Sequence, residues 1–114
     1  PEAYELYLKA KDLYARSDNY NQDLDAINMM KDAIVLDDKL IAAQLKLGQM
    51  YYDNGNYNEA DFLYARSLNK SRQVEDNTNI AESLRKQGQS FRKQRQIELA
   101  LEKYQANVLN ISFG

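Results

Sequence analysis

The 114-residue chain contains no cysteine and no histidine. Without cysteine it has no disulfide, no thiolate metal site and no cysteine nucleophile, and the composition fits a reducing, cytoplasmic compartment. Without histidine it lacks the commonest general base and the commonest metal ligand. No apolar run approaches the ~18 residues of a membrane span, and no signal-peptide pattern opens the chain. These absences argue against an enzyme, a cofactor protein and a membrane protein.

Proline and glycine are also scarce, with one proline and four glycines in the whole chain. Few residues therefore interrupt helices, and the composition favours helix throughout. The chain is long enough for one domain but not for two. It begins at Pro1 without a methionine and stops at Gly114 directly after a helical pattern. We therefore expect a single domain, residues 1–114, taken from a longer protein.

One pattern of residue types occurs three times. It places a small residue, a large one, a small one and an aliphatic one at offsets 0, 4, 7 and 8, which is one face of an α-helix. The starting residue is an alanine each time, and the intervals between the three alanines are 34 and 40 residues. The three sets are Ala26, Met30, Ala33, Ile34; Ala60, Tyr64, Ser67, Leu68; and Ala100, Tyr104, Asn107, Val108.

The middle occurrence follows a second helical segment that contains Leu47-Gly48 and Tyr51, with a turn at 54–56 between the two segments. Gly48 and Ala60 lack bulk, so two helices can approach closely there. This arrangement resembles the tetratricopeptide repeat, a helix–turn–helix unit of about 34 residues.

The resemblance implies an all-α fold, a right-handed α-solenoid of three antiparallel helical hairpins. The units would span approximately 3–38, 39–78 and 79–113. The six helices would span roughly 3–17, 21–37, 40–53, 57–73, 78–93 and 97–112.

The opening segment, residues 1–10, is similar to the start of the repeat region in some bacterial signalling proteins. The similarity implies a regulatory or scaffolding context and does not name a partner.

In the tetratricopeptide family the first helix of each unit lines a concave groove that binds a peptide or helix of a partner protein. The resemblance implies a non-catalytic interaction module of this kind. The groove residues carried over from the family pattern are Leu45, Lys46, Gln49, Tyr52, Arg85, Lys86, Gln89, Arg92 and Lys93.

Residues 83–97 carry five positive side chains and no carboxylate. The stretch has two interpretations: ordinary solvated surface, or a basic groove floor that grips an acidic peptide or a phosphate. Chaperone-binding members of the family use a clamp that contains a specific asparagine. Gln89 and Gln49 stand at the asparagine positions, so the clamp pattern is not met.

Three other functions compete with groove binding. The apolar residues Val108, Leu109, Ile111 and Phe113 cannot all point inward from one helix, which suggests either a homodimer through the C-terminal helix or contact with further repeats of a longer protein. Nucleic-acid binding through the basic helix 83–96 is disfavoured by the net charge of −2. Catalysis is disfavoured because the paired carboxylates, such as Asp37 and Asp38, fall in expected turns.

Overall fold

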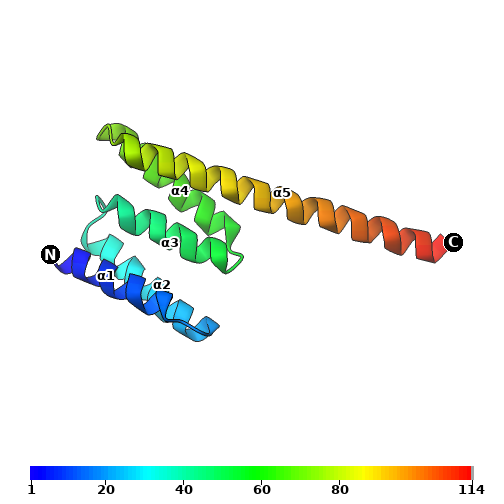
Figure 1. Cartoon of the computed structure of the whole chain (residues 1–114), viewed down its shortest axis with the longest axis horizontal. Helices are drawn as coiled ribbons and strands as arrows, with labels where there is room; N and C mark the ends of the chain where they lie inside the picture. Colours follow the sequence, from blue (N-terminus) through cyan, green and yellow to red (C-terminus); the bar gives the residue numbers. More distant parts are fainter. Residues whose placement is uncertain (114) are drawn as a thin grey trace.

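The computed structural model describes residues 1–113 of the chain, and the side chains of residues 1–109. Within this range the chain forms five α-helices and no strand. The helices are α1 (Glu2–Ala15), α2 (Tyr20–Leu36), α3 (Ile41–Asp53), α4 (Tyr57–Gln73) and α5 (Asn77–Phe113). The expected all-helical solenoid is confirmed (Figure 1).

Local signals explain where α2 begins and why the chain turns between α3 and α4. The Asn19 side chain caps α2 by accepting a 2.9 Å hydrogen bond from the Gln22 amide. Gly55 takes a positive φ of 81° between α3 and α4, a conformation that glycine adopts without steric cost. The Asn56 amide then donates back to the Tyr51 carbonyl over 2.8 Å, which closes the turn.

The closest helix contact lies between α3 and α4. Tyr64 of α4 is fully buried against Gly48 of α3. A Cβ added to Gly48 would lie only 2.6 Å from the Tyr64 ring. The aromatic ring therefore occupies the space that a side chain on α3 would need, and the two helices approach closely at Gly48, as the sequence predicted.

The helices are arranged in two layers. Helices α1 and α2 form one hairpin and α3 and α4 form a second, and α5 packs on α4. Helix α3 also contacts α1 on one side and α5 on the other, so α1, α3 and α5 share one face of the molecule (Figure 1). We call this the α1/α3/α5 face.

The core of this assembly lies mainly between the first two hairpins. It is built from small and aliphatic side chains of α1 to α4. Its fully enclosed members are Ala10, Ala26, Ile27, Met30, Ala43, Leu47, Met50 and Leu63.

The expectation of six helices is wrong. Instead of two helices at 78–93 and 97–112, the single helix α5 runs through Gln94, Arg95 and Gln96 without a break. In the second unit the corresponding residues are Asn54, Gly55 and Asn56, which form the turn. Glutamine and arginine favour the helix, and a side chain at position 95 opposes the positive φ that Gly55 adopts. The third hairpin is therefore not closed.

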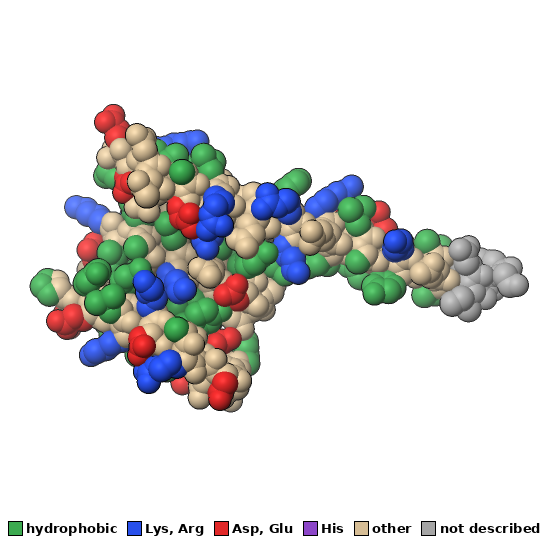
Figure 2. Space-filling view, in the orientation of Figure 1, with side chains coloured by type: hydrophobic (Ala, Val, Ile, Leu, Met, Phe, Trp, Pro, Cys, Tyr) green, Lys and Arg blue, Asp and Glu red, His purple; other side chains and the backbone are tan. Residues whose placement is uncertain are grey.

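The unbroken helix makes the molecule elongated. Its dimensions are 64 × 33 × 18 Å and its Cα radius of gyration is 17.5 Å, against ~13 Å for a compact domain of this length. Figure 1 shows the far part of α5 projecting away from the other helices. Figure 2 shows hydrophobic, basic and acidic side chains along its described part. The prediction for Ile111 and Phe113 concerns side chains that lie outside the described residues.

The contact between Gly48 and Tyr64 predicts different effects of alanine at two helical glycines. Gly48→Ala forces the buried ring to move, so we expect it to lower the free energy of unfolding by about 1–3 kcal/mol. Gly88→Ala is the matched control, because its Cβ would meet only Arg92 Nη1 at 3.7 Å. Its better helix propensity should raise stability by about 0.5–1 kcal/mol. Urea denaturation of both variants measures this, and equal effects would contradict the packing.

The missing turn predicts that three substitutions close the third hairpin. Replacing residues 94–96 by the turn of the second unit, as Gln94→Asn, Arg95→Gly and Gln96→Asn, should let the end of α5 fold back. We expect the radius of gyration to fall from 17.5 Å toward ~13 Å in dilute X-ray scattering. A triple alanine variant at the same positions should keep the original value. An Asn-Gly-Asn variant as long as the parent would show that this turn does not decide the shape.

Candidate functional site

Three lysines lie on the α1/α3/α5 face, one from each of these three helices. They are Lys11 of α1, Lys46 of α3 and Lys86 of α5. Burial is the main cause of the lowered pKa of Lys46 and of Lys86, and a neighbouring lysine adds to it in each case: Lys11 at Lys46, and Lys46 at Lys86. We call these three residues the lysine row.

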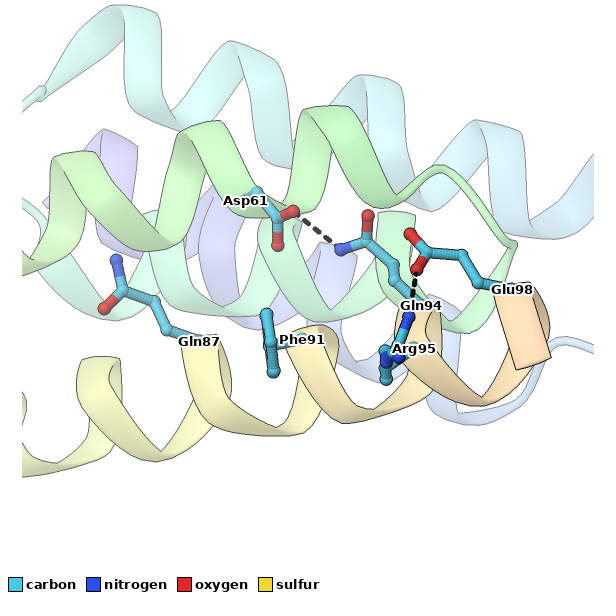
Figure 3. Close-up of a pocket in the computed structure, with 6 residues that line it drawn as sticks. All are labelled: Asp61, Gln87, Phe91, Gln94, Arg95 and Glu98. Carbon is cyan, nitrogen blue, oxygen red and sulfur yellow. Dashed lines mark hydrogen bonds and ion pairs between the residues drawn. The ribbon is translucent and has the colours of Figure 1, made fainter.

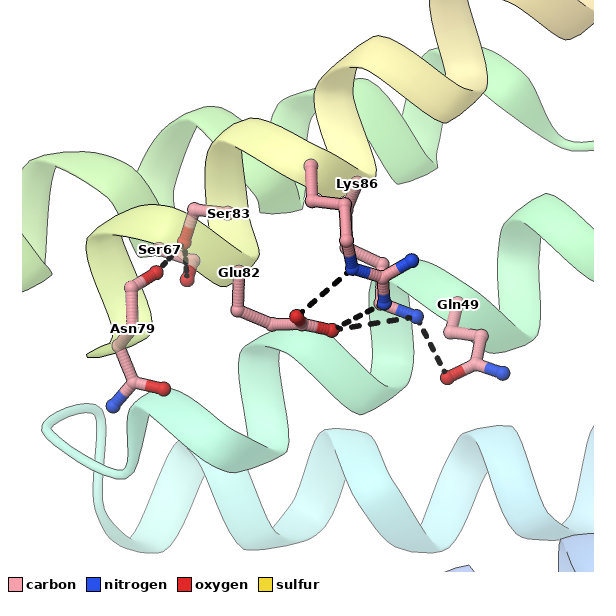
Figure 4. A network of polar contacts seen from close by, with 7 residues as sticks. Gln49, Ser67, Asn79, Glu82, Ser83 and Lys86 are labelled. Carbon is pink, nitrogen blue, oxygen red and sulfur yellow. Dashed lines mark hydrogen bonds and ion pairs between the residues drawn. The ribbon is translucent and has the colours of Figure 1, made fainter. Parts of the chain in front are cut away.

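Lys86 is the most enclosed lysine of the row. Its side chain is only 11% exposed, and Nζ donates a 3.1 Å hydrogen bond to Gln49 Oε1 of α3 (Figure 4). The Glu82 carboxylate lies 4.0 Å away, at the limit of an ion pair. Burial lowers the pKa of Lys86, and the neighbouring Arg85 guanidinium lowers it further.

Lys46 occupies the centre of the row. Its ammonium group lies 5.6 Å from the centre of the Tyr14 ring, within the range of a cation–π contact. Burial lowers the pKa of Lys46, while the Asp53 carboxylate opposes this effect. Lys11 makes a similar contact with the Tyr7 ring at 5.6 Å.

The Asp53 carboxylate interacts with side chains of all three helices of this face. It accepts a 2.7 Å hydrogen bond from the Tyr14 hydroxyl, which joins α1 to the end of α3. Burial raises the pKa of Tyr14, and the bond to Asp53 raises it further. Asp53 also acts electrostatically on Lys46 and Lys86. Its charge therefore offsets part of the positive potential of the row.

The basic stretch 83–97 is not free of carboxylate partners. Arg85 donates two hydrogen bonds to Glu82, of 2.6 and 3.0 Å, and this contact lowers the pKa of Glu82. Arg95 pairs with Glu98 at 3.2 Å. Both partners lie just outside the stretch, three residues away along the helix. Arg85 and Arg95 therefore have carboxylate partners on the same helix, and Lys86 lies 4.0 Å from Glu82.

The other residues predicted for the groove divide into core and surface. Leu45 is buried against Ala60 and Tyr64, so its assignment to an exposed groove is wrong. Tyr52 is half-buried and packs edge-on against Tyr57 at 5.6 Å, as a structural side chain would. Arg92 and Lys93 are exposed and Gln89 is half-buried, farther along α5.

A pocket of about 460 Å³ lies elsewhere, between α4 and α5 (Figure 3). Asp61 lies at one side and is already engaged, because it accepts hydrogen bonds from Ser90 and Gln94 over 2.6 and 2.8 Å. Phe91 lines the pocket and is 70% exposed, whereas its counterpart Tyr51 is half-buried under α4. The pocket thus marks the place that the unclosed third hairpin leaves open.

Comparison with known protein families matches residues 39–106 to the tetratricopeptide repeat. The match covers more than half of the chain and includes α3, α4 and most of α5. The chain belongs to the tetratricopeptide repeat family. No match was found among curated proteins or among solved structures.

Tetratricopeptide repeats mediate protein–protein interaction and form a non-catalytic fold. Within the described residues, no three carboxylates gather closely enough to hold a metal ion. No helix in the described part of the chain combines the length and the apolar character that a membrane crossing requires.

Sequence reasoning found two members of the lysine row and missed the third. Lys46 and Lys86 occupy groove positions of the repeat pattern. Lys11 stands where the repeat has its packing glycine, and it was not assigned to the groove. Lys46 follows Lys11 by 35 residues, and Lys86 follows Lys46 by 40 residues. These intervals are close to the 34 and 40 residues between the alanines of the repeat, so the spacing could have pointed to Lys11 as a residue of this face.

The electrostatics of the row predict how the pKa of Lys46 responds to its neighbours. Lys11→Met removes a repulsive charge, so the pKa of Lys46 should rise toward its ordinary value. Asp53→Asn removes an attractive charge, so the pKa should fall further. Lys9→Met is the control, because Lys9 lies two residues from Lys11 and therefore on the opposite side of α1. Heteronuclear NMR titration of the lysine side chains measures all three, and equal responses to the Lys9 and Lys11 variants would contradict the arrangement.

Proposed function

We propose that this tetratricopeptide repeat domain is a non-catalytic interaction module that binds an acidic peptide segment or helix of a partner protein on its α1/α3/α5 face. The observation that carries the proposal is the lysine row, Lys11, Lys46 and Lys86. Three helices that are distant in sequence contribute one amine each to the same face.

The amines of the row are not neutralised by equal numbers of carboxylates. Lys86 binds the neutral oxygen of Gln49 at 3.1 Å, closer than the 4.0 Å to Glu82. Lys46 and Lys11 lie over tyrosine rings. The lowered pKa values of Lys46 and Lys86 record a site where positive charge is disfavoured. An added carboxylate would relieve that cost, which is a reason for an acidic ligand to bind there.

Pre-organisation supports the same function. Tyr14 and Asp53 tie α1 to α3, and Lys86 and Gln49 tie α5 to α3. A ligand on this face therefore meets side chains that are already positioned, and it loses less free energy in ordering them. The proposal includes a regulatory or scaffolding role in bacterial signalling and a cytoplasmic location, which the sequence suggested.

Charge reversal on α1 tests the proposal. The probe is a fluorescent octapeptide of alternating glutamate and alanine, compared with its glutamine counterpart by fluorescence anisotropy. Lys11→Glu should weaken binding of the glutamate peptide by about tenfold or more. Lys9→Glu makes the same change in net charge on the other side of α1 and should alter affinity less than about twofold.

Asp53→Asn should change the affinity for the acidic peptide in the opposite direction. The asparagine keeps an oxygen that accepts the Tyr14 hydrogen bond but removes the negative charge, so the acidic peptide should bind more tightly. Binding that prefers the glutamine peptide, or that responds equally to the Lys9 and Lys11 variants, would contradict the proposed function.

A further inference from the structure

One stripe of α5 can be followed from Ser83 to Val108. It advances by alternating steps of four and three residues, the period of a helix that packs along another helix. Its members from Ser83 onward are Ser83, Gln87, Ser90, Gln94, Ile97, Leu101, Tyr104 and Val108.

The first half of the stripe is polar and faces α4. The Ser83 hydroxyl lies 2.7 Å from that of Ser67 on α4. Ser90 and Gln94 both donate to Asp61 of α4. Ser83 and Ser90 are fully buried by this contact. The first residue of α4, Tyr57, lies close to Gln94. Helix α4 therefore covers the stripe on α5 only as far as Gln94.

The second half of the same stripe is apolar. Ile97 is 38% exposed, Leu101 is 55% exposed and Tyr104 is 68% exposed, and Val108 continues the spacing. The stripe changes from polar to apolar where α4 no longer accompanies it. Apolar residues that are exposed at the period of helix packing indicate that a further helix covers them.

We infer that a second copy of this chain covers this apolar stripe, with the two α5 helices antiparallel over residues 97–109. The stripe is self-complementary in that orientation. Leu101 would pack against Tyr104 of the partner subunit, and Ile97 against Val108 of the partner subunit. The two-fold symmetry forms each of these two residue pairs twice, as an isologous contact requires.

The orientation follows from the position of α4. In a parallel pair, the partner's α5 would continue along residues 83–94 of the first copy, where α4 already lies. In the antiparallel pair, the partner's α5 leaves past residue 109 and away from α4. The proposed contact thus continues the α4–α5 interface along the same stripe of α5.

The flanking residues are compatible with this pairing. Ala100 would face Asn107 of the partner subunit, and Glu98 would face Gln105 of the partner subunit, so no like charges oppose each other. Glu102 and Lys103 lie on the outer side of the helix. The contact is about 20 Å long, which places it among weak, reversible interfaces, with dissociation in the micromolar range.

Two leucines of α5 form a matched pair for the test. Leu101 lies on the stripe and Leu99 lies two residues away, on the opposite side of the helix. Their exposures are similar, 55% and 47%, so glutamate at either position should leave the fold unchanged. In sedimentation equilibrium from low micromolar to near-millimolar concentration, the unaltered chain should dimerise. Leu101→Glu should weaken the dimer by about tenfold or more, and Leu99→Glu by less than about twofold.

Disulfide trapping tests the orientation, because the chain has no cysteine of its own. Ala100→Cys and Asn107→Cys chains, mixed and oxidised, should cross-link to each other more than either cross-links to itself. A chain that stays monomeric at near-millimolar concentration, a dimer equally sensitive at Leu99 and Leu101, or preferential self-linkage at position 100 would each overturn the proposal. These readouts are independent of acidic-peptide binding.

Discussion

The close contact between Gly48 and Tyr64 is the constraint on which the arrangement of the helices depends. The ring of Tyr64 is buried where a side chain on α3 would otherwise stand, so the separation of α3 and α4 is set by the absence of one Cβ. Helix α3 in turn contacts both α1 and α5. Its position therefore determines which side chains of those two helices meet on the α1/α3/α5 face, including the three amines of the lysine row.

The second and third units show that packing residues alone do not form a hairpin. Gly88, Ala100 and Tyr104 repeat the pattern of Gly48, Ala60 and Tyr64, yet Tyr104 is 68% exposed and Gly88 meets only Arg92. The difference lies in the turn, since residues 94–96 are good helix formers where the second unit has Asn-Gly-Asn. A continuous helix cannot fold its own end back, so Ile97, Leu101 and Tyr104 remain exposed at the surface of the chain.

Much of the fold was predictable because its signals are local. The bounds of α3 and α4, the turn at Gly55 and the burial of Tyr64 followed from spacing and from the residues that favour turns. The break near residue 95 was wrongly inferred by extending the repeat pattern against local propensity. In the candidate site, Lys46 and Lys86 lie on the α1/α3/α5 face, although Lys86 is largely buried, whereas Leu45 lies in the core. The carboxylate partners of Arg85 and Arg95 lie directly outside the basic stretch, three residues from each arginine. Lys11 lies at a position that the repeat pattern reserves for packing.

The continuity of α5 is the central claim, since the elongated shape and the apolar stripe both depend on it. Cysteines placed at Leu84 and Ala106 carry spin labels for a distance measurement by pulsed electron resonance, in a mixture diluted with unlabelled chain. A continuous helix separates the two positions by about 33 Å, at 1.5 Å per residue. A distribution centred near that distance is the predicted result. A closed third hairpin would bring the labels within about 15 Å, roughly the separation of neighbouring helices plus the label arms, and would contradict the account.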